Sequence, residues 1–158
     1  MAILKMMVGC PGSGKTTYVK MMANKKDLIV SRDKIRFSLI APGIPYFSKE
    51  DEVFHEFITK INKGAENHDV VWADATHITR GSRHKLYSRL DKTLFNRIEV
   101  YVINTPLERC LLNNERREGR ERVPESALRD MYAKFTYPTE DEFEDMECSI
   151  INIEYIFR

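Results

Sequence analysis

Five short apolar runs along the chain predict β-strands. They cover Ile3–Val8, Asp27–Val30, Val70–Ala73, Ile98–Ile103 and Ile150–Ile156. Continuous apolar runs of this length, bounded by polar or turn-forming residues, are typical of strands that are buried on both faces of a sheet. The pattern therefore predicts a sheet that is covered by other elements on both sides.

A helical pattern lies between the second and third runs. Its apolar residues recur at helical spacing and are Val53, Phe54, Phe57, Ile58 and Ile61. Ser48 and Asp51 form a candidate capping box before this helix, and Gly64 is a candidate end. An amphipathic helix is therefore predicted between these signals.

Two further helix starts precede and follow a polar segment near the end of the chain. Thr105, Pro106 and Glu108 have the residue types preferred at the N-cap, N1 and N3 positions. Pro124 begins another helix, whose apolar face carries Leu128, Met131, Tyr132 and Phe135. Strands and helices thus alternate, which predicts an α/β fold, a doubly wound parallel sheet of four to five strands with helices on both faces. At 158 residues we expect a single domain over residues 1–158.

Composition narrows the class of protein. Charged residues make up 31% of the chain with a net charge of +1, and no apolar run approaches the roughly 18 residues of a membrane span. We therefore expect no membrane association. Cys10, Cys110 and Cys148 are odd in number and far apart in the sequence, so a disulfide framework or a zinc site is not supported. We expect reduced thiols, a cytoplasmic location and no obligate protein partner.

Charge is unevenly distributed along the sequence. A basic stretch carries Arg80, Arg83, Lys85, Arg89, Lys92 and Arg97, against a single acidic residue, Asp91. Acidic residues gather later, between Glu140 and Glu147. The basic stretch is a candidate binding surface for nucleic acid, and the alternative is that both runs are solvated surface.

The most specific pattern is "GCPGSGKT", residues 9–16, which satisfies G-x-x-x-x-G-K-[ST] between a predicted strand and a predicted helix. Its glycines let backbone N–H groups surround a phosphate at the positive end of the helix. Lys15 is expected to reach the β- and γ-phosphates, and the Thr16 hydroxyl to join the coordination shell of Mg²⁺. The motif predicts ATP as the phosphate donor, with GTP as an alternative. Its expected nucleotide-binding residues are Gly12, Ser13, Gly14, Lys15, Thr16 and Thr17.

Polar residues follow the second and third predicted strands, where ligands bind in a doubly wound sheet. Asp33 would open a helix, and Arg36 lies one turn later on the same face. Asp33 is a candidate general base for a hydroxyl acceptor, and Arg36 a candidate contact for an anion on it. The alternative is a helix N-cap and a surface arginine.

Asp74 follows the third predicted strand directly. It is placed to orient Mg²⁺ or to hold an arginine, and the alternative is an ordinary loop aspartate. Thr76 and His77 come next and are weaker candidates. We expect His77, like the other histidines, to lie at the surface or on a helix.

A polar, arginine-rich segment, Asn113–Pro124, runs off the end of a predicted helix. Guanidinium groups on a closing loop stabilise the charge that spreads over a moving phosphoryl group. We interpret this segment as a lid. The alternative is a solvated helix end, because glutamates alternate with the arginines.

Together these motifs resemble the kinase domain of polynucleotide 5'-hydroxyl kinases, the bacteriophage and bacterial end-healing enzymes of the P-loop kinase superfamily. The resemblance spans most of the chain. "GCPGSGKTT" resembles the family's P-loop, "SRDKIR" is similar to its R-D-x-x-R element, "ADATH" stands where its D-x-[TN] element lies, and "NNERREGRERVP" is similar to its lid. The resemblance implies a P-loop kinase sheet and ATP-dependent phosphorylation of 5'-OH ends of RNA or DNA in nucleic-acid repair.

The resemblance also implies roles on the acceptor side. Asp33 matches the family's general base on the 5'-hydroxyl group, and Arg36 matches the residue that contacts the phosphate beside it. Asp74 and Thr76 match residues of the acceptor site.

In the lid, the resemblance points to Asn113, Arg116 and the Val123-Pro124 pair. Arg116 is therefore expected to be catalytic and to bind the nucleotide together with Arg120. The sequence departs from the family at Leu112, where the lid often carries a further arginine, and the loop to Pro124 is longer than in the phage enzyme. The assignment among Arg116, Arg117 and Arg120 therefore stays open.

Two other functions also stay open. The near-neutral charge and the lack of a nucleic-acid-binding module favour a P-loop kinase of a small hydroxylated metabolite or nucleoside. The ending "YPTEDEFEDMECSIINIEY" resembles that of the wider family of small P-loop kinases, which includes enzymes on small molecules. A third function is a nucleotide-binding regulatory ATPase that transfers phosphate only to water. The P-loop indicates the donor and leaves the acceptor open.

Overall fold

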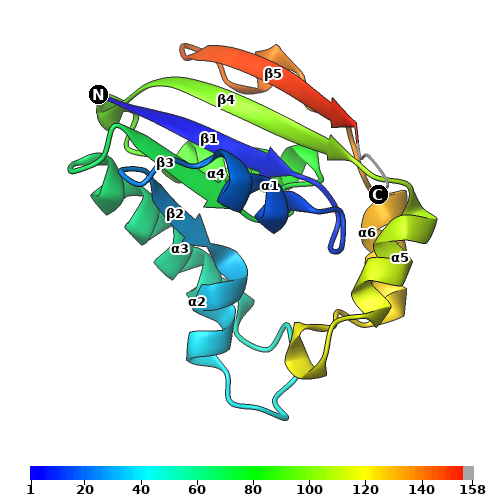
Figure 1. Cartoon of the computed structure of the whole chain (residues 1–158). Coiled ribbons are helices and arrows are strands. Elements are labelled where there is room, and N and C mark those ends of the chain that lie inside the picture. The colour runs from blue at the N-terminus through cyan, green and yellow to red at the C-terminus, as the bar shows by residue number, and fades with distance from the viewer. Residues whose placement is uncertain (155–158) are drawn as a thin grey trace.

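A computed structural model describes residues 1–154 and contains a five-stranded parallel sheet (Figure 1). The strands are β1 (Ala2–Val8), β2 (Leu28–Ser31), β3 (Val70–Asp74), β4 (Phe95–Asn104) and β5 (Glu147–Glu154), in the order β2-β3-β1-β4-β5. The α/β class and all five predicted strands are confirmed. Tyr155 and Ile156, which end the fifth predicted strand, lie outside the described residues.

Helices cover both faces of the sheet. They are α1 (Lys15–Met22), α2 (Arg32–Leu39), α3 (Glu50–Ala65), α4 (Arg80–Arg89), α5 (Leu107–Glu115) and α6 (Glu125–Ala133). In Figure 1, α1 lies on one face and α3 and α4 lie on the other, while α5 and α6 stand beyond the carboxyl end of β4. Three short 3₁₀ helices, η1 (Lys92–Leu94), η2 (Gly119–Glu121) and η3 (Glu140–Glu142), lie in the connections.

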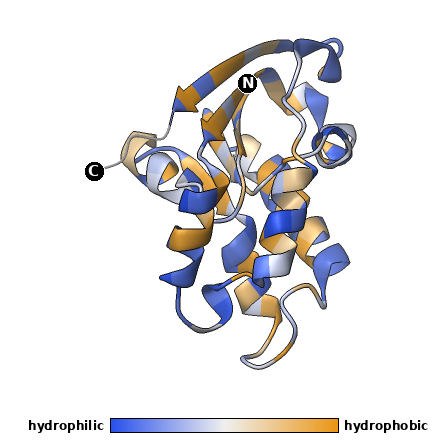
Figure 2. Cartoon of the chain, turned by 90° about the vertical axis from the view of Figure 1, so that its right-hand side faces the viewer, coloured by the Kyte–Doolittle hydropathy of each residue, from blue (hydrophilic) through white to orange (hydrophobic). Residues whose placement is uncertain are grey.

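Alternating strand positions supply two apolar cores, because successive side chains of a strand point to opposite faces. On one face, Leu4 and Met6 of β1 pack with Phe57 of α3. On the other face, Met7 packs with Trp72 of β3 and with α1. Much of the sheet is therefore apolar in Figure 2, whereas the lid is hydrophilic. Among residues 1–154, no helix is long and apolar enough to cross a membrane.

The ends of α3 differ from the prediction. Gly64 does not end the helix but lies inside its last turn, where a Cβ atom would overlap the side chain of Leu28. This glycine therefore allows α3 to approach β2 closely. Neither Ser48 nor Asp51 takes part in a cap, because α3 begins at Glu50 without a side-chain cap. The Glu50 carboxylate instead accepts hydrogen bonds from Arg36 of α2.

Part of the basic stretch pairs with the late acidic residues. Arg83 of α4 makes an ion pair with Glu142 of η3 at 2.7 Å, with exposed side-chain fractions of 0% and 3%. One turn earlier, Arg80 pairs with Asp141 at 2.9 Å at the surface. Arg97 pairs with a glutamate of its own strand. Arg80, Arg83 and Arg97 are therefore paired with acidic side chains, whereas Lys85, Arg89 and Lys92 are exposed at the surface.

Candidate active site

The P-loop connects β1 to α1 at the point where the strand order reverses. Gly12 and Gly14 have φ angles of 79° and 99°, which side chains with a Cβ atom rarely adopt. A Cβ atom at Gly12 would also overlap the carbonyl oxygen of Cys110. Lys15 is buried, and its Nζ lies 3.5 Å from the carbonyl oxygen of Cys10 inside the loop. The ammonium group of Lys15 thus lies inside the loop, where P-loop proteins place the lysine that binds phosphate.

Two side chains from other segments anchor the loop. Thr105 Oγ1 donates a hydrogen bond to Ser13 O at 2.7 Å, and Asn113 Nδ2 donates one to Gly12 O at 2.9 Å. Thr105 was predicted as the N-cap of α5, but Pro106 takes that position and the Thr105 hydroxyl is free for the P-loop. Thr105 directly follows β4, at the carboxyl edge of the sheet, and this position in the sequence could have indicated that it lies at the site.

Thr16 and Asp74 meet beside the P-loop, with Thr16 Oγ1 donating to Asp74 Oδ2 at 2.9 Å. Mg²⁺ prefers oxygen ligands and usually binds through one or two carboxylates together with substrate phosphates. The pair fits that requirement. Among the described residues there is no group of three His, Cys, Asp or Glu side chains that could hold a metal alone.

A cavity of about 150 Å³, which we call the central pocket, opens beside the P-loop. Its walls come from the P-loop, the start of α2, the segment between α2 and α3, the end of β3 and the lid. The residues selected from the sequence that meet here are Lys15, Thr16, Asp33, Arg36, Asp74 and Thr76. The structure thus brings the expected donor and acceptor residues to one cavity.

The Asp33 carboxylate lines the central pocket, and only one of its two oxygens is hydrogen-bonded within residues 1–154. It does not cap α2, because Ser31 Oγ accepts that hydrogen bond from Lys34 N at 3.3 Å. Asp33 Oδ1 accepts hydrogen bonds from Arg36 Nη1 and, at 2.9 Å, from the Tyr46 hydroxyl. None of the hydrogen bonds within residues 1–154 reaches Oδ2, and the side chain is 50% exposed. One oxygen is held and the other remains available to a ligand.

Arg36 is held by two residues that the sequence analysis missed, Tyr46 and Glu50. Its Nε donates to Glu50 Oε1 at 2.7 Å and its Nη2 donates to Glu50 Oε2 at 3.0 Å. Its guanidinium group lies 4.4 Å from the centre of the Tyr46 ring. Burial opposes the charge of Glu50, but hydrogen bonds and positive charge from Arg36 and Arg32 outweigh it and lower the pKa of Glu50. The sequence around Arg36 does not predict its contact with Glu50, because Glu50 lies on a different helix, α3.

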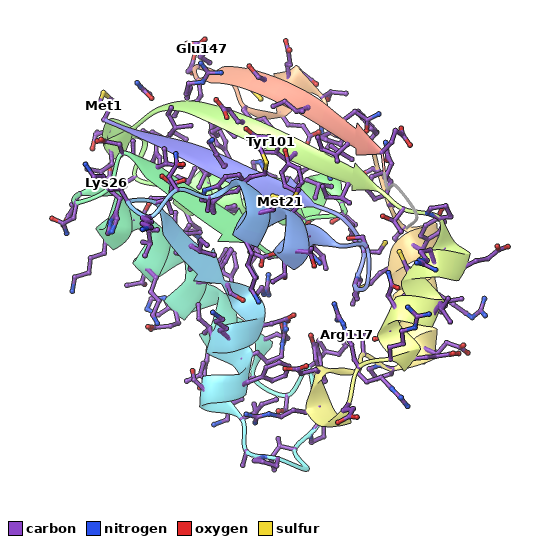
Figure 3. The ribbon with its side chains drawn as sticks, viewed as in Figure 1. Met1, Met21, Lys26, Tyr101, Arg117 and Glu147 are labelled. Carbon is purple, nitrogen blue, oxygen red and sulfur yellow. The ribbon has the colours of Figure 1, made fainter. Side chains whose placement is uncertain are left out.

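The arginines of the lid have different positions. Arg117 lines the central pocket, on the side of the lid that faces α2 (Figure 3). Arg116 is exposed and does not line it. Arg120 Nη1 donates to Ile40 O at 2.7 Å, and its guanidinium group lies 4.9 Å from the Phe37 ring. The geometry therefore favours Arg117 for contact with a ligand, and Arg120 joins the lid to the end of α2.

His77 is buried, contrary to the expectation of a surface histidine. Its Nδ1 lies 2.8 Å from Met7 O, and its ring centre lies 5.9 Å from that of Phe57. Its φ of 45° is in the left-handed region. Burial lowers the pKa of His77 from 6.5 to about 3, so the side chain is neutral in the folded protein. His77 connects the loop after β3 to the end of β1.

This burial predicts a loss of stability in acid. Between pH 6.5 and about 3 the unfolded chain binds a proton at His77 and the folded chain does not, so the free energy of unfolding falls as pH falls. We expect His77→Asn, which tolerates the left-handed backbone, to be less stable at pH 7 but to lose less stability between pH 7 and 4.5. Urea unfolding of both proteins at the two pH values measures this. Equal losses would contradict the prediction.

These features define a class of protein, a P-loop nucleotide-binding fold of the kinase type. Residues 4–138 match the family model AAA_33, described as an AAA domain, and the chain belongs to that family. A search of curated proteins finds no match. The kinase-type domain supports a phosphotransferase, and the P-loop fold implies nucleotide binding.

Solved structures share the fold. A chain of the Pnkp1/Rnl/Hen1 RNA repair complex has 20% identity and a TM-score of 0.67, with 84% of this chain and 43% of that chain covered. Kti12 from Chaetomium thermophilum, in complex with ADP-AlF3, has 16% identity and a TM-score of 0.62, covering 96% and 89%. A sugar kinase from Janibacter sp. HTCC2649 has 19% identity and a TM-score of 0.61, covering 96% and 85%. The chain thus spans less than half of the RNA-repair polypeptide.

Proposed function

We propose that this protein is an ATP- and Mg²⁺-dependent kinase that phosphorylates the 5'-OH end of RNA or DNA, in the cytoplasm, as a single domain. The observation that supports it most is the position of Asp33, whose carboxylate is anchored through one oxygen in the same pocket as Lys15. A base beside a phosphate-binding lysine is what transfer to a hydroxyl group requires. The likeness to a chain of an RNA repair complex supports the nucleic-acid acceptor.

In this mechanism, Lys15 and the P-loop N–H groups hold the phosphates of ATP. Thr16 and Asp74 would hold Mg²⁺, which neutralises charge on the phosphates when bound. Asp33 accepts the proton of the acceptor hydroxyl as its oxygen bonds to the γ-phosphorus, and the bond from that phosphorus to the β,γ-bridging oxygen breaks to release ADP. Arg117 stabilises the charge that develops on the transferred group.

A small hydroxylated metabolite or nucleoside is the second candidate acceptor. The sugar kinase matches this chain over most of both lengths. The pairing of Arg80 and Arg83 with acidic residues also weakens the argument from the basic stretch for a nucleic-acid acceptor. These observations make the acceptor, not the donor, the point to test.

Transfer of γ-³²P from ATP with Mg²⁺ to matched 5'-OH RNA and DNA oligonucleotides tests the proposal. We expect label on 5'-OH oligonucleotides and none on 5'-phosphorylated controls. Label on sugars or nucleosides but on no oligonucleotide would favour the second candidate. Slow ATP hydrolysis that no acceptor changes would indicate a regulatory ATPase instead.

A further inference from the structure

Phe47, an aromatic residue in the segment between α2 and α3, lines the central pocket and is nevertheless 42% exposed. Ile44 of the same segment is also exposed, so two large apolar side chains contact water here. Contact between apolar surface and water is unfavourable, and exposed apolar groups beside a polar cavity are typical of ligand-binding surfaces. An aromatic surface in the pocket that contains Asp33 is therefore open to a ligand.

The Phe47 ring is held in place by Tyr46. The two ring centres lie 4.6 Å apart with an angle of 73° between the ring planes, which is the edge-to-face arrangement that aromatic pairs prefer. The Tyr46 hydroxyl donates a hydrogen bond to Asp33 Oδ1 at 2.9 Å and accepts one from Arg36 Nη1 at 2.9 Å. Because Tyr46 is fixed at its hydroxyl and Phe47 packs on its ring, Phe47 loses little conformational entropy when a ligand contacts it.

The same contacts separate the Phe47 ring from the Asp33 carboxylate by one tyrosine side chain. Tyr46 contacts Asp33 with its hydroxyl group and Phe47 with its ring. In a terminal nucleotide, a single ribose carries both the 5'-hydroxyl group and the base. A nucleotide whose 5'-hydroxyl group lies at Asp33 can therefore present its base to Phe47, and flat bases stack on aromatic side chains.

We propose that Phe47 stacks on the nucleobase of the terminal nucleotide of the acceptor. This inference rests on the proposed function and deepens it, because it makes a base part of what the site recognises. A metabolite without an aromatic ring cannot form this stack. Every nucleobase has a π face, so we expect little sequence preference at the terminal position.

Two 5'-OH oligonucleotides that differ only at the terminal nucleotide, one natural and one abasic, test the inference. Their affinities are measured by fluorescence anisotropy of a 3'-label, with ADP and Mg²⁺ present so that no transfer occurs. We expect the wild-type protein to bind the natural oligonucleotide about 5- to 100-fold more tightly, the usual contribution of one stack between a base and an aromatic side chain. Phe47→Ala should lose that preference, and Phe47→Trp should keep it.

The pair of oligonucleotides separates stacking from a structural role of Phe47. A substitution that only disturbs the segment between α2 and α3 would weaken both ligands by the same factor, whereas loss of a stack weakens only the natural one. Tyr137→Ala is the matched control, because Tyr137 is another exposed aromatic residue and does not line the central pocket. We expect this variant to bind both oligonucleotides as the wild type does.

Three results would overturn the inference. They are equal wild-type affinity for the two oligonucleotides, equal weakening of both by Phe47→Ala, and no binding of either. Transfer from ATP to the same oligonucleotides separates this inference from the proposed function. Base-dependent binding without transfer would retain the stacking site and reject the kinase assignment. Transfer at equal rates to both oligonucleotides would retain the kinase assignment and reject the stack.

Discussion

Asp33→Asn is expected to lower kcat for phosphoryl transfer by about 10²- to 10⁴-fold, the usual contribution of a general base. Asparagine keeps an oxygen that can accept the hydrogen bonds from Tyr46 and Arg36, so the pocket should keep its shape. It cannot accept the acceptor's proton at neutral pH. Single-turnover transfer with saturating ATP and acceptor measures the effect.

ATP affinity provides the internal control for this variant. Asp33 makes none of the P-loop contacts, so we expect ATP to bind Asp33→Asn as it binds the wild type. Lys15→Ala should instead lose both ATP affinity and transfer, because Lys15 is the buried cation of the P-loop. Transfer by Asp33→Asn at the wild-type rate would remove Asp33 from the role of base.

Arg83→Ala is expected to reduce the free energy of unfolding by about 3 to 5 kcal/mol, because it leaves the buried carboxylate of Glu142 without its partner. Arg83 also donates to His77 O at 2.9 Å, so the loop after β3 loses a contact. For a chain of this size the loss corresponds to a decrease in melting temperature of roughly 10 °C. Thermal and urea unfolding measure it.

Arg80→Ala is the matched control, since Arg80 lies one turn earlier on α4 and pairs with Asp141 in solvent. We expect its stability to match the wild type within error, because exposed ion pairs are screened by water and salt. A double variant, Arg83→Met with Glu142→Leu, should recover part of the loss by removing both buried charges. If Arg80→Ala and Arg83→Ala reduced the free energy of unfolding equally, burial would not explain the effect of Arg83→Ala.

The strands and the P-loop were predictable because the signals for them are local. The central strands β1 and β3 are short, mainly apolar runs, and most of their residues are buried, whereas the edge strand β5 has no buried residue within its described range. The P-loop motif likewise specifies a turn whose glycines must adopt left-handed backbone angles, and Gly12 and Gly14 do so. The position of Asp33 in the central pocket was predictable because it follows the carboxyl end of a parallel strand, where ligands bind.

Contacts between distant segments were not predictable in the same way. Glu50 begins α3 but holds an arginine of α2, and Arg83 pairs with an acid far along the chain. His77 has no pattern that marks it as buried, because the end of β1 supplies its partner. Among the lid arginines, sequence spacing could not separate Arg116 from Arg117, since only the path of the chain decides which one faces the pocket.

The sequence by itself therefore determined the α/β class, the five strands and the phosphate-binding loop, which depend on short-range backbone and side-chain preferences. The tertiary structure alone decided which charged groups are paired and which remain open to a ligand. Arg36 is held by Glu50, whereas Arg117 lines the central pocket without a hydrogen bond from its side chain to any of residues 1–154. The physical reason is that the availability of a charge depends on every segment that packs around it, and local sequence does not specify those neighbours.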